Sequence, residues 1–398
     1  MSEWQNAKPF VELALSIDKH LPGYVDAYYG PEEIRDAVDA AGKVPLEELF
    51  STLDMVIDST HQDAKLGEER REYLSAELRA MQTTLRILNG EEIGIVEESQ
   101  GLYGLTPTWT DERVFVGAHQ DLEDLLPGSG TLAERMDDLK GKTIVPTESL
   151  NSIVGIITDD FRHRTAELIA LPEDESLEFS YVHDKPWGAY NWYLGKCVSR
   201  IDINLDLPWY AGDLPHVLAH ETYPGHHTEH AVKERELYRE EGNLEHCILI
   251  NNAPSAVVSE GIGENALEMI ATPEEVVKIM QTILEKAGLK GVNGDQVCQI
   301  YEALRPLRMV SINQLLMFHG QGATDEEAIH YGIRYGLVNE QRSRKSLEFL
   351  KDPLWRSYVT LYPLGYELVQ DFISQGKDKN ERFVRLIRQP FTTAQLAR

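Results

Sequence analysis

The sequence predicts a mainly α-helical protein with one small antiparallel β element. Two observations lead to this fold class. Apolar residues recur at helical spacing before residue 170 and again after Pro208, and only the stretch between them has the composition of strands. Hydrophobic residues make up 42% and charged residues 26% of the 398 residues, a balance typical of a folded protein rather than of a disordered chain.

In the first part of the chain, one apolar stripe is especially regular. Its members follow one another in steps of three and four residues, the spacing that places side chains on one face of a helix. Such a face is normally buried, so we expect it in the core. The stripe consists of Leu74, Leu78, Met81, Leu85 and Leu88.

Between Ser176 and Asn204 the pattern changes to short runs rich in β-branched and aromatic residues. Asp184-Lys185-Pro186 and Gly195 interrupt these runs, as turn residues do. We therefore expect a small antiparallel sheet here. Its candidate strand residues are Phe179, Tyr181, Tyr190, Trp192, Tyr193, Val198, Ile201 and Ile203.

Helical spacing returns after Pro208 and continues to about Ile387, with Ser255, Thr272, Thr324 and Asp352 as candidate cap or turn residues. No repeat or linker rich in Pro, Gly or Ser divides the sequence, so we expect a single unit over residues 1–398. If the chain has two lobes, they are a helical lobe 1–170 and a second lobe 171–398, which would contain the sheet and the histidine-rich segment described below.

The chain is strongly acidic. Its 66 Asp and Glu residues outnumber 38 Lys and Arg residues, giving a net charge of −28, and such a surface makes nucleic acid an unexpected partner. No stretch reaches the roughly 18 apolar residues that a membrane span needs, so no membrane partner is expected either. Residues 1–20 lack the apolar core of a secretory signal, and the three cysteines form no CxxC pair. The sequence therefore predicts a cytoplasmic protein.

Histidine is concentrated in one segment. Six of the 13 histidines lie between His216 and His246, where an even spread would place about one. This segment contains HETYPGHH, residues 220–227, in which a His-Glu pair is followed by further histidines. Because neutral histidine nitrogens and carboxylates are common ligands of zinc, the segment predicts a zinc centre.

The spacing of HETYPGHH departs from the HExxH pattern of helical zinc peptidases, in which residues i and i+4 bind one ion. Position i+4 from His220 is Pro224, which cannot bind a metal. On a regular helix His227 would stand about 10 Å from His220 along the axis, too far for one zinc. If Pro224-Gly225 bulges out, His226 takes the place of the second ligand. We therefore expect His220 and His226 to bind the metal.

Two other pairs, His216 with His220 and His226 with His230, have the i, i+4 spacing and remain alternatives. These pairs leave Glu221 without a role. Beside a ligand, in contrast, its carboxylate can accept a proton from zinc-activated water. Glu221 is thus the expected general base.

A catalytic zinc site needs a third protein ligand and an open position. Glu260 is the candidate, because it lies in SEGIGE, residues 259–264, which has the pattern of a buried helix carrying acids inward. Glu264, one turn further on, is expected to orient a ligand histidine. His227, like His216 and His230, is expected to support the ligands or to be structural. The alternative for the two carboxylates is a solvated helix face.

HETYPGHH, followed by SEG at residues 259–261, resembles the HExxPGHH and EGW signatures of the bacterial family known as domain of unknown function 885. PGYVDAYYGP, residues 22–31, is similar to an N-terminal segment of such proteins, so the resemblance extends over nearly the whole chain. The family looks like the gluzincin metallopeptidases. The resemblance implies zinc, a helical fold with a substrate groove, and a glutamate as general base. Here Ile262 replaces the Trp of the EGW signature.

YVTLYPLG, residues 358–365, resembles the SYKIG ending of that family and the YFPTYxLG segment of helical zinc carboxypeptidases. Tyr362 is common to both patterns, and Tyr362 or Tyr358 is expected to donate a hydrogen bond to the oxyanion formed during hydrolysis. For a substrate carboxylate, Arg305 and Arg308 are candidates, because guanidinium binds carboxylates bidentately. Such a clamp would indicate a carboxypeptidase.

The sequence thus predicts a zinc-dependent hydrolase, most simply a metallopeptidase that cleaves short peptides. Two alternatives remain. One is a zinc amidohydrolase acting on a non-peptide small molecule, and the other is a catalytically silent protein that binds metal or peptide. The expected partners are therefore zinc and a peptide or small amide substrate, while the oligomeric state is not predicted.

Overall fold

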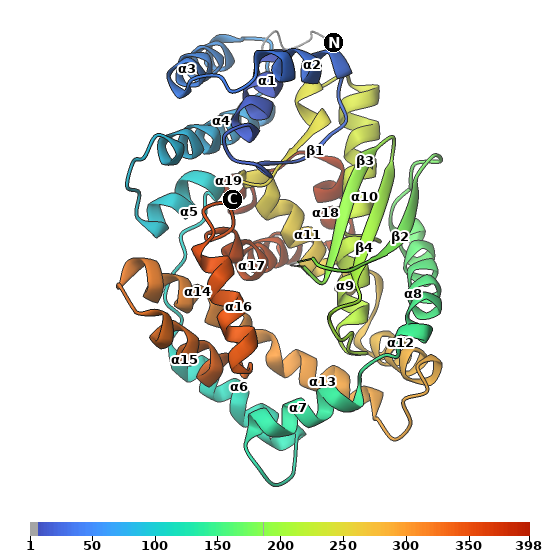
Figure 1. Ribbon diagram of the computed structural model, residues 1–398. Coiled ribbons are helices and arrows are strands. Elements are labelled where there is room, and N and C mark those ends of the chain that lie inside the picture. The colour runs from blue at the N-terminus through green and yellow to red at the C-terminus, as the bar shows by residue number, and fades with distance from the viewer. Residues whose placement is uncertain (1–6, 186) are drawn as a thin grey trace.

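The computed structural model describes residues 7–185 and 187–398 and shows a mainly helical protein with two small sheets in that part of the chain (Figure 1). The prediction of a mainly helical fold is confirmed. Pro186, one of the expected turn residues, lies outside the described residues. Within them, no helix is both long and apolar enough to cross a lipid bilayer.

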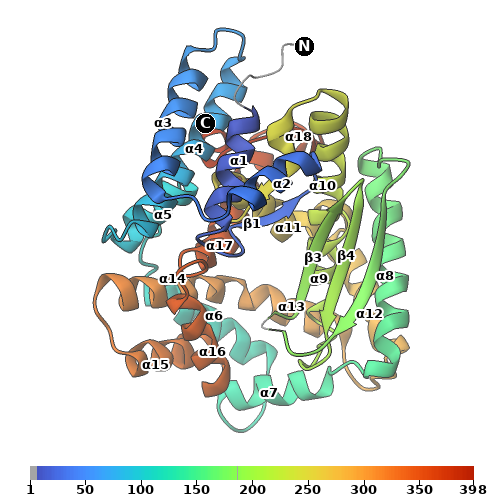
Figure 2. The same ribbon diagram turned by 45° about the horizontal axis from the view of Figure 1, so that its top comes forward.

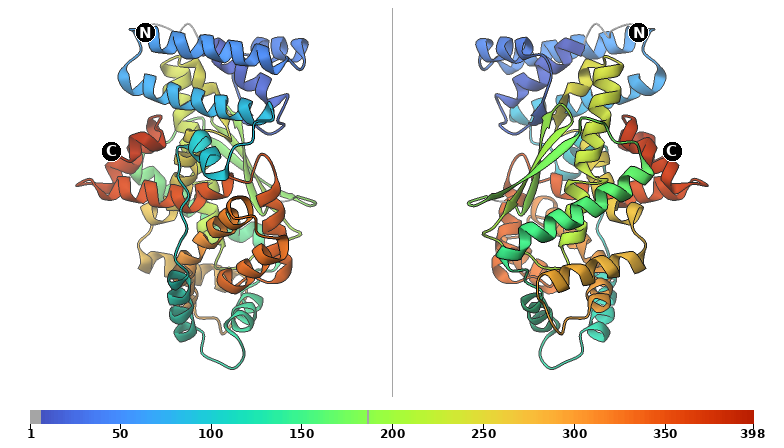
Figure 3. Two further views of the ribbon diagram at one scale, coloured as in Figure 1. Left: turned by 90° about the vertical axis from the view of Figure 1, so that its left-hand side faces the viewer. Right: turned by 90° about the vertical axis from the view of Figure 1, so that its right-hand side faces the viewer.

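The helices before the three-stranded sheet are α1 (Ala7–Asp18), α2 (Glu32–Ala41), α3 (Leu46–Gln62), α4 (Glu68–Leu88), α5 (Ile95–Tyr103), α6 (Glu112–Leu125), α7 (Leu132–Lys142) and α8 (Thr147–Leu168). α4 carries the predicted apolar stripe, and Leu74, Leu78, Met81 and Leu85 are buried as expected. Figures 1 and 3 place α1 to α4 at one end of the molecule and α6 and α7 at the other.

The predicted β segment forms a three-stranded sheet of β2 (Ser176–Val182), β3 (Ala189–Gly195) and β4 (Val198–Asn204). The strand order is β2-β4-β3, with β3 antiparallel and β2 parallel to β4. The sheet is therefore mixed, and the expectation of an antiparallel element is wrong for β2. Lys196 and Cys197, both with φ of 57°, form a tight hairpin that pairs β3 with β4. β2 pairs with the other edge of β4.

This order leaves β3 at an edge of the sheet. In Figure 2, β3 lies toward the middle of the molecule and α8 lies on the outer side of the sheet. α8 packs there with residues of the strands, among them Phe179, Tyr181 and Ile203, in one apolar cluster. The sheet is thus covered on its outer side, while its β3 edge is directed toward the helices that follow it.

After the sheet come α9 (Leu214–Glu221), α10 (His226–Lys233), α11 (Pro254–Ile270), α12 (Pro273–Lys286), α13 (Gly294–Leu304), α14 (Val310–Leu315), α15 (Asp325–Gly336), α16 (Glu340–Lys351), α17 (Leu361–Ser374), α18 (Lys379–Arg388) and α19 (Thr393–Leu396). Thr272 and Thr324 begin α12 and α15 with capping boxes, as expected. Asp352 is a turn residue at the end of α16, whereas Ser255 lies inside α11 and does not cap it. Short 3-10 or π-helical segments are η1 (Glu234–Glu240), η2 (Leu244–Cys247), η3 (Arg305–Met309), η4 (Leu316–Gly320) and η5 (Tyr358–Thr360).

Apolar packing joins segments from both sides of residue 170. β1 (Val25–Tyr28) pairs with β5 (Ile248–Ile250), and the apolar cluster of α1, α3 and α4 includes side chains of β5. Leu102 and Tyr103 share another cluster with Val257 of α11. The possible lobes 1–170 and 171–398 therefore do not have separate cores, because the N-terminal helices complete their core with the segment that follows α10.

Candidate metal centre

The histidine-rich segment forms two helices rather than one. α9 ends at Glu221, α10 begins at His226, and residues 222–225 between them are not helical. Within this break the N–H of Gly225 donates to the carbonyl oxygen of Ala219, six residues back, at 3.0 Å. The break lies where the sequence predicted one, but it spans four residues instead of a two-residue bulge.

The break brings two histidines together. The ring centroids of His220 and His226 are 4.6 Å apart, with the ring planes at 88°. On a continuous helix, residues six positions apart point to different faces and could not meet in this way. The interruption between α9 and α10 is therefore what makes His220 and His226 neighbours.

Glu260 comes from α11, which approaches its neighbours through glycines. A β-carbon on Gly263 would stand 2.7 Å from the ring of His220, and one on Gly261 would stand 2.5 Å from the carbonyl oxygen of Gly365 in α17. Neither position has room for a side chain. The two glycines of SEGIGE thus allow the close helix packing at which Glu260 reaches the histidines.

His220, His226 and Glu260 meet at one point. Nε2 of His220 is 3.2 Å from Oε2 of Glu260, and Nε2 of His226 is 3.9 Å from Oε1. One nitrogen or oxygen of each residue lies within 4.8 Å of those of the other two. His220 is 7% and Glu260 is 5% exposed. Two imidazoles and one carboxylate are a donor set that zinc uses in catalytic sites.

Hydrogen bonds behind the His226 ring decide which of its nitrogens carries a lone pair. Nδ1 lies 3.1 Å from the Ser259 hydroxyl, which donates to Glu229 at 2.6 Å. Because the hydroxyl has one proton and a carboxylate only accepts, Ser259 must accept from an N–H at Nδ1. The lone pair is then on Nε2, the atom that faces Glu260.

His220 has the same orientation. Its Nδ1 lies 3.5 Å from Glu264, while its Nε2 faces Glu260. Burial lowers the pKa of His220, but the carboxylate of Glu260 close to its ring raises it more, so that the net pKa is about 9. Glu260 and Glu264 therefore favour a positive charge on the ring of His220 that lies between them. A divalent cation bound there would supply that positive charge instead.

Glu260 itself has an oxygen that suits a cation. Its Oε2 is buried and accepts no hydrogen bond of good geometry, although Nε2 of His220 is only 3.2 Å away. Its Oε1 accepts a hydrogen bond from the Tyr358 hydroxyl at 2.7 Å. A buried carboxylate oxygen without a partner is costly, and an ion bound between Glu260 and the histidines would remove that cost.

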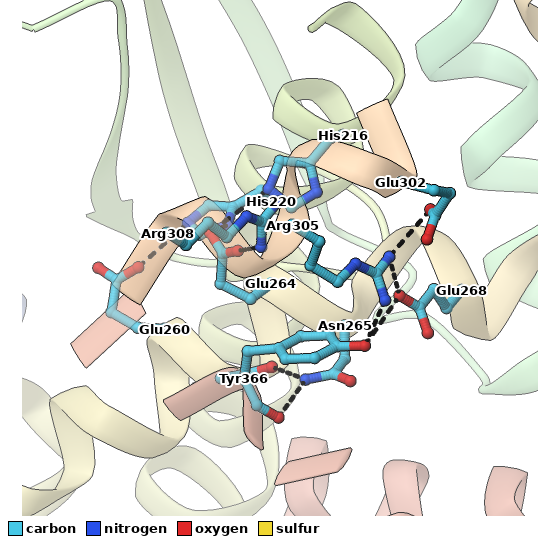
Figure 4. A network of polar contacts seen from close by, with 11 residues as sticks. His216, His220, Glu260, Glu264, Asn265, Glu268, Glu302, Arg305, Arg308 and Tyr366 are labelled. Atoms are coloured by element: carbon cyan, nitrogen blue, oxygen red, sulfur yellow. Dashed lines mark hydrogen bonds and ion pairs between the residues drawn. The ribbon is translucent and has the colours of Figure 1, made fainter. Parts of the chain in front are cut away.

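The alternative pair His216 and His220 lies beside Glu264 (Figure 4). Oε1 of Glu264 is 3.3 Å from Nε2 of His216, and Arg308 pairs with the other oxygen. Burial raises the pKa of Glu264, but the charges of His216 and Arg308 lower it well below its ordinary value. A carboxylate already paired with a guanidinium is better suited to orienting His220 than to binding a metal.

The other alternative pair, His226 and His230, lies beside Glu229. Both oxygens of Glu229 are engaged, one by Lys233 at 2.5 Å and the other by the Ser259 hydroxyl. The ammonium group would also repel a cation at this position. This group is therefore less suited to a metal than the one around Glu260.

The candidate ligands lie on the wall of a cavity of about 850 Å³. Glu221 lines the same cavity, and Asn191 of the edge strand β3 donates to the Glu221 carbonyl oxygen at 2.7 Å. Tyr190 and Trp192 of β3 line it as well. The size of this cavity suits a small molecule or a short peptide, and the β3 edge runs along it.

Tyr358 of η5 and Tyr362 in the first turn of α17 line this cavity. Tyr358 orients Glu260 through its hydrogen bond. The Tyr362 ring lies 6.4 Å from that of His220, and its hydroxyl has no hydrogen bond to a described residue. Burial and the nearby charge of Glu260 raise the pKa of both phenols well above its ordinary value, so both remain protonated donors.

Arg305 and Arg308 do not line this cavity. Arg308 holds Glu264, as described above, and faces a separate cavity of about 360 Å³. Figure 4 shows Arg305 in a different network, formed with Glu268, Glu302 and Tyr366. Both arginines are thus paired with glutamates and lie outside the lining of the cavity beside Glu260, where the sequence-based expectation was a clamp for a substrate carboxylate.

The side chain of His227, contrary to expectation, points away from the candidate ligands. It is fully buried, with Nδ1 2.8 Å from the Ser199 hydroxyl in β4 and Nε2 2.9 Å from Glu175. Burial raises the pKa of Glu175, but hydrogen bonds from His227 and Tyr223 lower it to about 2. Consecutive helical residues point about 100° apart, so a histidine directly after His226 faces the sheet instead.

Three residues at this centre had no role in the sequence-based prediction. Glu229 lies one helical turn after His226 and Ser259 precedes Glu260, so their proximity follows from helical spacing once the ligands are known. Asp26, which also lines the cavity, belongs to the PGYVDAYYGP segment. Its place depends on the pairing of β1 with β5, which no local pattern reveals.

Comparison with known proteins shows likeness of fold only. No protein-family model matches the chain, and no curated protein matches its sequence. A solved structure described as a "putative lipoprotein" from Colwellia psychrerythraea is 16% identical, with a TM-score of 0.52, and the match covers 87% of this chain and 65% of that one. The chain therefore spans less than two thirds of that protein. A "putative lipoprotein of unknown function" from Shewanella oneidensis is 12% identical over 88% of this chain and 70% of that one, with a TM-score of 0.45.

These descriptions assign no activity. Membership of the family known as domain of unknown function 885, the gluzincin character of the fold and the cytoplasmic location therefore all stay predictions.

Proposed function

We propose that the protein is a zinc-dependent hydrolase, and specifically a metallopeptidase that cleaves short peptides. His220, His226 and Glu260 are the proposed zinc ligands. The observation that carries this proposal is the buried Oε2 of Glu260, which accepts no hydrogen bond of good geometry and lies 3.2 Å from Nε2 of His220. Nε2 of His226 lies 3.9 Å from the other oxygen of the same carboxylate. This arrangement fits a divalent cation better than it fits a core that binds no ion.

When bound, zinc lowers the pKa of a water molecule and polarises a carbonyl group. Glu221, which follows His220 and lines the same cavity, is the proposed general base. Its carboxylate accepts a proton from the attacking water and returns it to the leaving amine. Tyr362 donates a hydrogen bond to the oxyanion, and Tyr358 keeps Glu260 in place.

The edge strand β3 favours a peptide as the substrate. Within the described residues no other strand pairs with the outer edge of β3, and β3 side chains line the cavity. An extended peptide could pair with that edge by strand addition and so bring one of its amides toward Glu260. Arg305 and Arg308 give no reason to prefer a carboxypeptidase.

Digestion of a defined peptide mixture tests this proposal. We expect the zinc-loaded protein to cleave some of the peptides, as detected by mass spectrometry, and Glu221→Gln to retain zinc but lose at least about 100-fold in rate. If the wild-type protein binds zinc but cleaves no peptide, the peptidase proposal fails. A non-peptide amide substrate or a silent binding protein would then be favoured.

A further inference from the structure

Asp26 is a carboxylate directed toward the same cavity by an irregularity in β1. The register between β1 and β5 shifts between Val25 and Ala27, so Asp26 is the extra residue of a β-bulge. Bulges re-aim a side chain and are common next to active sites. Asp26 lines the cavity, and the Tyr190 hydroxyl of β3 donates a hydrogen bond to its Oδ1.

Asp26 has no positively charged partner, unlike two other carboxylates that line this cavity. Glu229 pairs with Lys233 at 2.5 Å, and Glu245 pairs with Arg70 at 2.7 Å. No Lys, Arg or His of the described chain lies within ion-pair distance of Asp26. An ionised carboxylate can accept about four hydrogen bonds, so most of its capacity is available to a molecule in the cavity.

The electrostatic surroundings of Asp26 also favour a cation beside it. Burial raises the pKa of Asp26, the Tyr190 hydrogen bond and the charge of His226 lower it, and the charges of Glu260 and Glu221 raise it, with a net increase. Asp26 is thus close enough to the candidate metal centre to sense its charges. A cation beside Asp26 would offset the cost of keeping this carboxylate ionised.

Three aromatic rings form one group on the cavity wall, and the hydroxyl of one of them, Tyr190, contacts Asp26. The rings of Tyr190 and Trp192 are 4.7 Å apart, and Trp187 lies 5.2 Å from Tyr190. The protein itself places a cation over two of these rings, Lys185 over Trp187 at 5.7 Å and Arg200 over Trp192 at 5.8 Å. A carboxylate beside an aromatic ring, such as Asp26 beside Tyr190, is a combination that recognises organic ammonium groups, because the ring face carries partial negative charge and the carboxylate a full one.

We propose that Asp26 and Tyr190 bind a cationic group of the substrate while a nearby amide lies at His220, His226 and Glu260. The cationic group is an ammonium or guanidinium, supplied by a free α-amino group or by a Lys or Arg side chain. This inference rests on the proposed peptidase function for the identity of the substrate. The binding preference itself does not depend on cleavage.

Peptide binding to zinc-loaded Glu221→Gln protein tests the inference without hydrolysis. Isothermal titration calorimetry would compare Ala-Ala-Phe with its N-acetylated form, and acetyl-Lys-Ala-Phe with acetyl-norleucyl-Ala-Phe. We expect the charged member of one pair to bind about tenfold or more tightly than the neutral member. A preference within the first pair identifies the α-amino group as the ligand, and a preference within the second identifies the basic side chain.

Adding Asp26→Asn to this protein should abolish that preference, because Asn has the same shape without the charge. Tyr190→Phe should reduce the preference while leaving Asp26 in place. The matched control is Glu348→Gln, which removes a carboxylate from another part of the cavity wall and should leave the preference unchanged.

The inference is overturned if the charged and neutral peptides of both pairs bind with equal affinity, or if no peptide binds. It is also overturned if the preference for the charged peptide survives in Asp26→Asn. A preference that depends on Asp26, in a protein whose Glu221-containing form cleaves no peptide, would support this inference and contradict the peptidase proposal. The two failures can therefore be told apart.

Discussion

The carbonyl oxygen of His220 lies 1.9 Å from the point where a β-carbon on Gly225 would stand. Residue 225 can therefore be only glycine without a shift of the backbone that carries His220. The close contact exists because the chain turns back on α9 before α10 begins, and this turn is what brings His226 to His220. The identity of residue 225 is thus linked directly to the geometry of the candidate metal centre.

Gly225→Ala should destabilise the protein by at least about 3 kcal/mol, because a backbone atom would have to move to admit the methyl group. Chemical denaturation would measure this change, and zinc titration should show weaker binding by any folded fraction. Gly117→Ala is the control, since nothing lies within 4 Å of its β-carbon position and alanine favours the helix. Wild-type stability and zinc affinity in Gly225→Ala would contradict the role of the break.

Tyr358 and Tyr362 should separate into two roles. Tyr358→Phe removes the hydrogen bond to Glu260 and should weaken zinc binding about tenfold or more, as loss of a residue that orients a ligand does. Tyr362→Phe should leave zinc affinity unchanged and lower kcat by about 100-fold, because it removes a donor to the oxyanion. Zinc titration and steady-state kinetics on both variants check this. If Tyr362→Phe loses zinc while Tyr358→Phe keeps it, the roles are assigned the wrong way round.

Arg308 should act through Glu264 rather than on substrate. Arg308→Gln leaves Glu264 without its guanidinium partner, so we expect weaker zinc binding and an unchanged KM ratio between peptides with a free C-terminal carboxylate and amidated ones. Arg305→Gln serves as the comparison, because Arg305 lies in a separate network and should affect neither quantity. A selective rise in KM for free-carboxylate peptides in either variant would restore the carboxylate clamp expected from sequence.

Glu77 should make stability depend on pH. Burial raises the pKa of Glu77 from its ordinary 4.5 to about 7, although hydrogen bonds from Ser255 act to lower it. The folded state therefore holds this proton more tightly than the unfolded state. Its contribution to stability is fully present below about pH 4.5 and is lost as the pH rises through about 7.

Glu77→Gln removes this titration and keeps an oxygen that can accept from the Ser255 N–H. The variant should have nearly the same free energy of unfolding as the wild type near pH 5. Near pH 8 its free energy of unfolding should be higher by about 2 to 3 kcal/mol. Urea denaturation at both pH values measures the difference. A difference in stability that does not change with pH would show that Glu77 titrates near its ordinary pKa.

Helical periodicity predicted much of the helical structure, because a stripe such as Leu74 to Leu85 needs only a local pattern to be recognised. The position of the three-stranded sheet followed from composition in the same way. Its topology did not, since the β3–β4 hairpin leaves two outer edges open and no local pattern shows that β2 pairs with that of β4. The pairing of β1 with β5 joins segments more than 200 residues apart and has no local signal at all.

The proposed ligand set could be derived from sequence because Pro224 excludes the regular spacing and leaves His226 as the next histidine. The surroundings of these residues could not. Whether Arg308 faces a substrate or Glu264 is decided by how α11 packs against η3, and the direction of His227 is decided by the sheet. Asp26 reaches the cavity only through long-range strand pairing.

Zinc binding by His220, His226 and Glu260 is tested most directly by the metal content of purified protein after exposure to zinc and dialysis. The wild type and Glu221→Gln should each retain one zinc per chain, while His220→Ala, His226→Ala and Glu260→Ala should retain almost none. Circular dichroism of each variant would show that the loss is not due to unfolding. A wild-type protein without zinc, or a folded His226→Ala protein that retains it, would contradict the proposed centre.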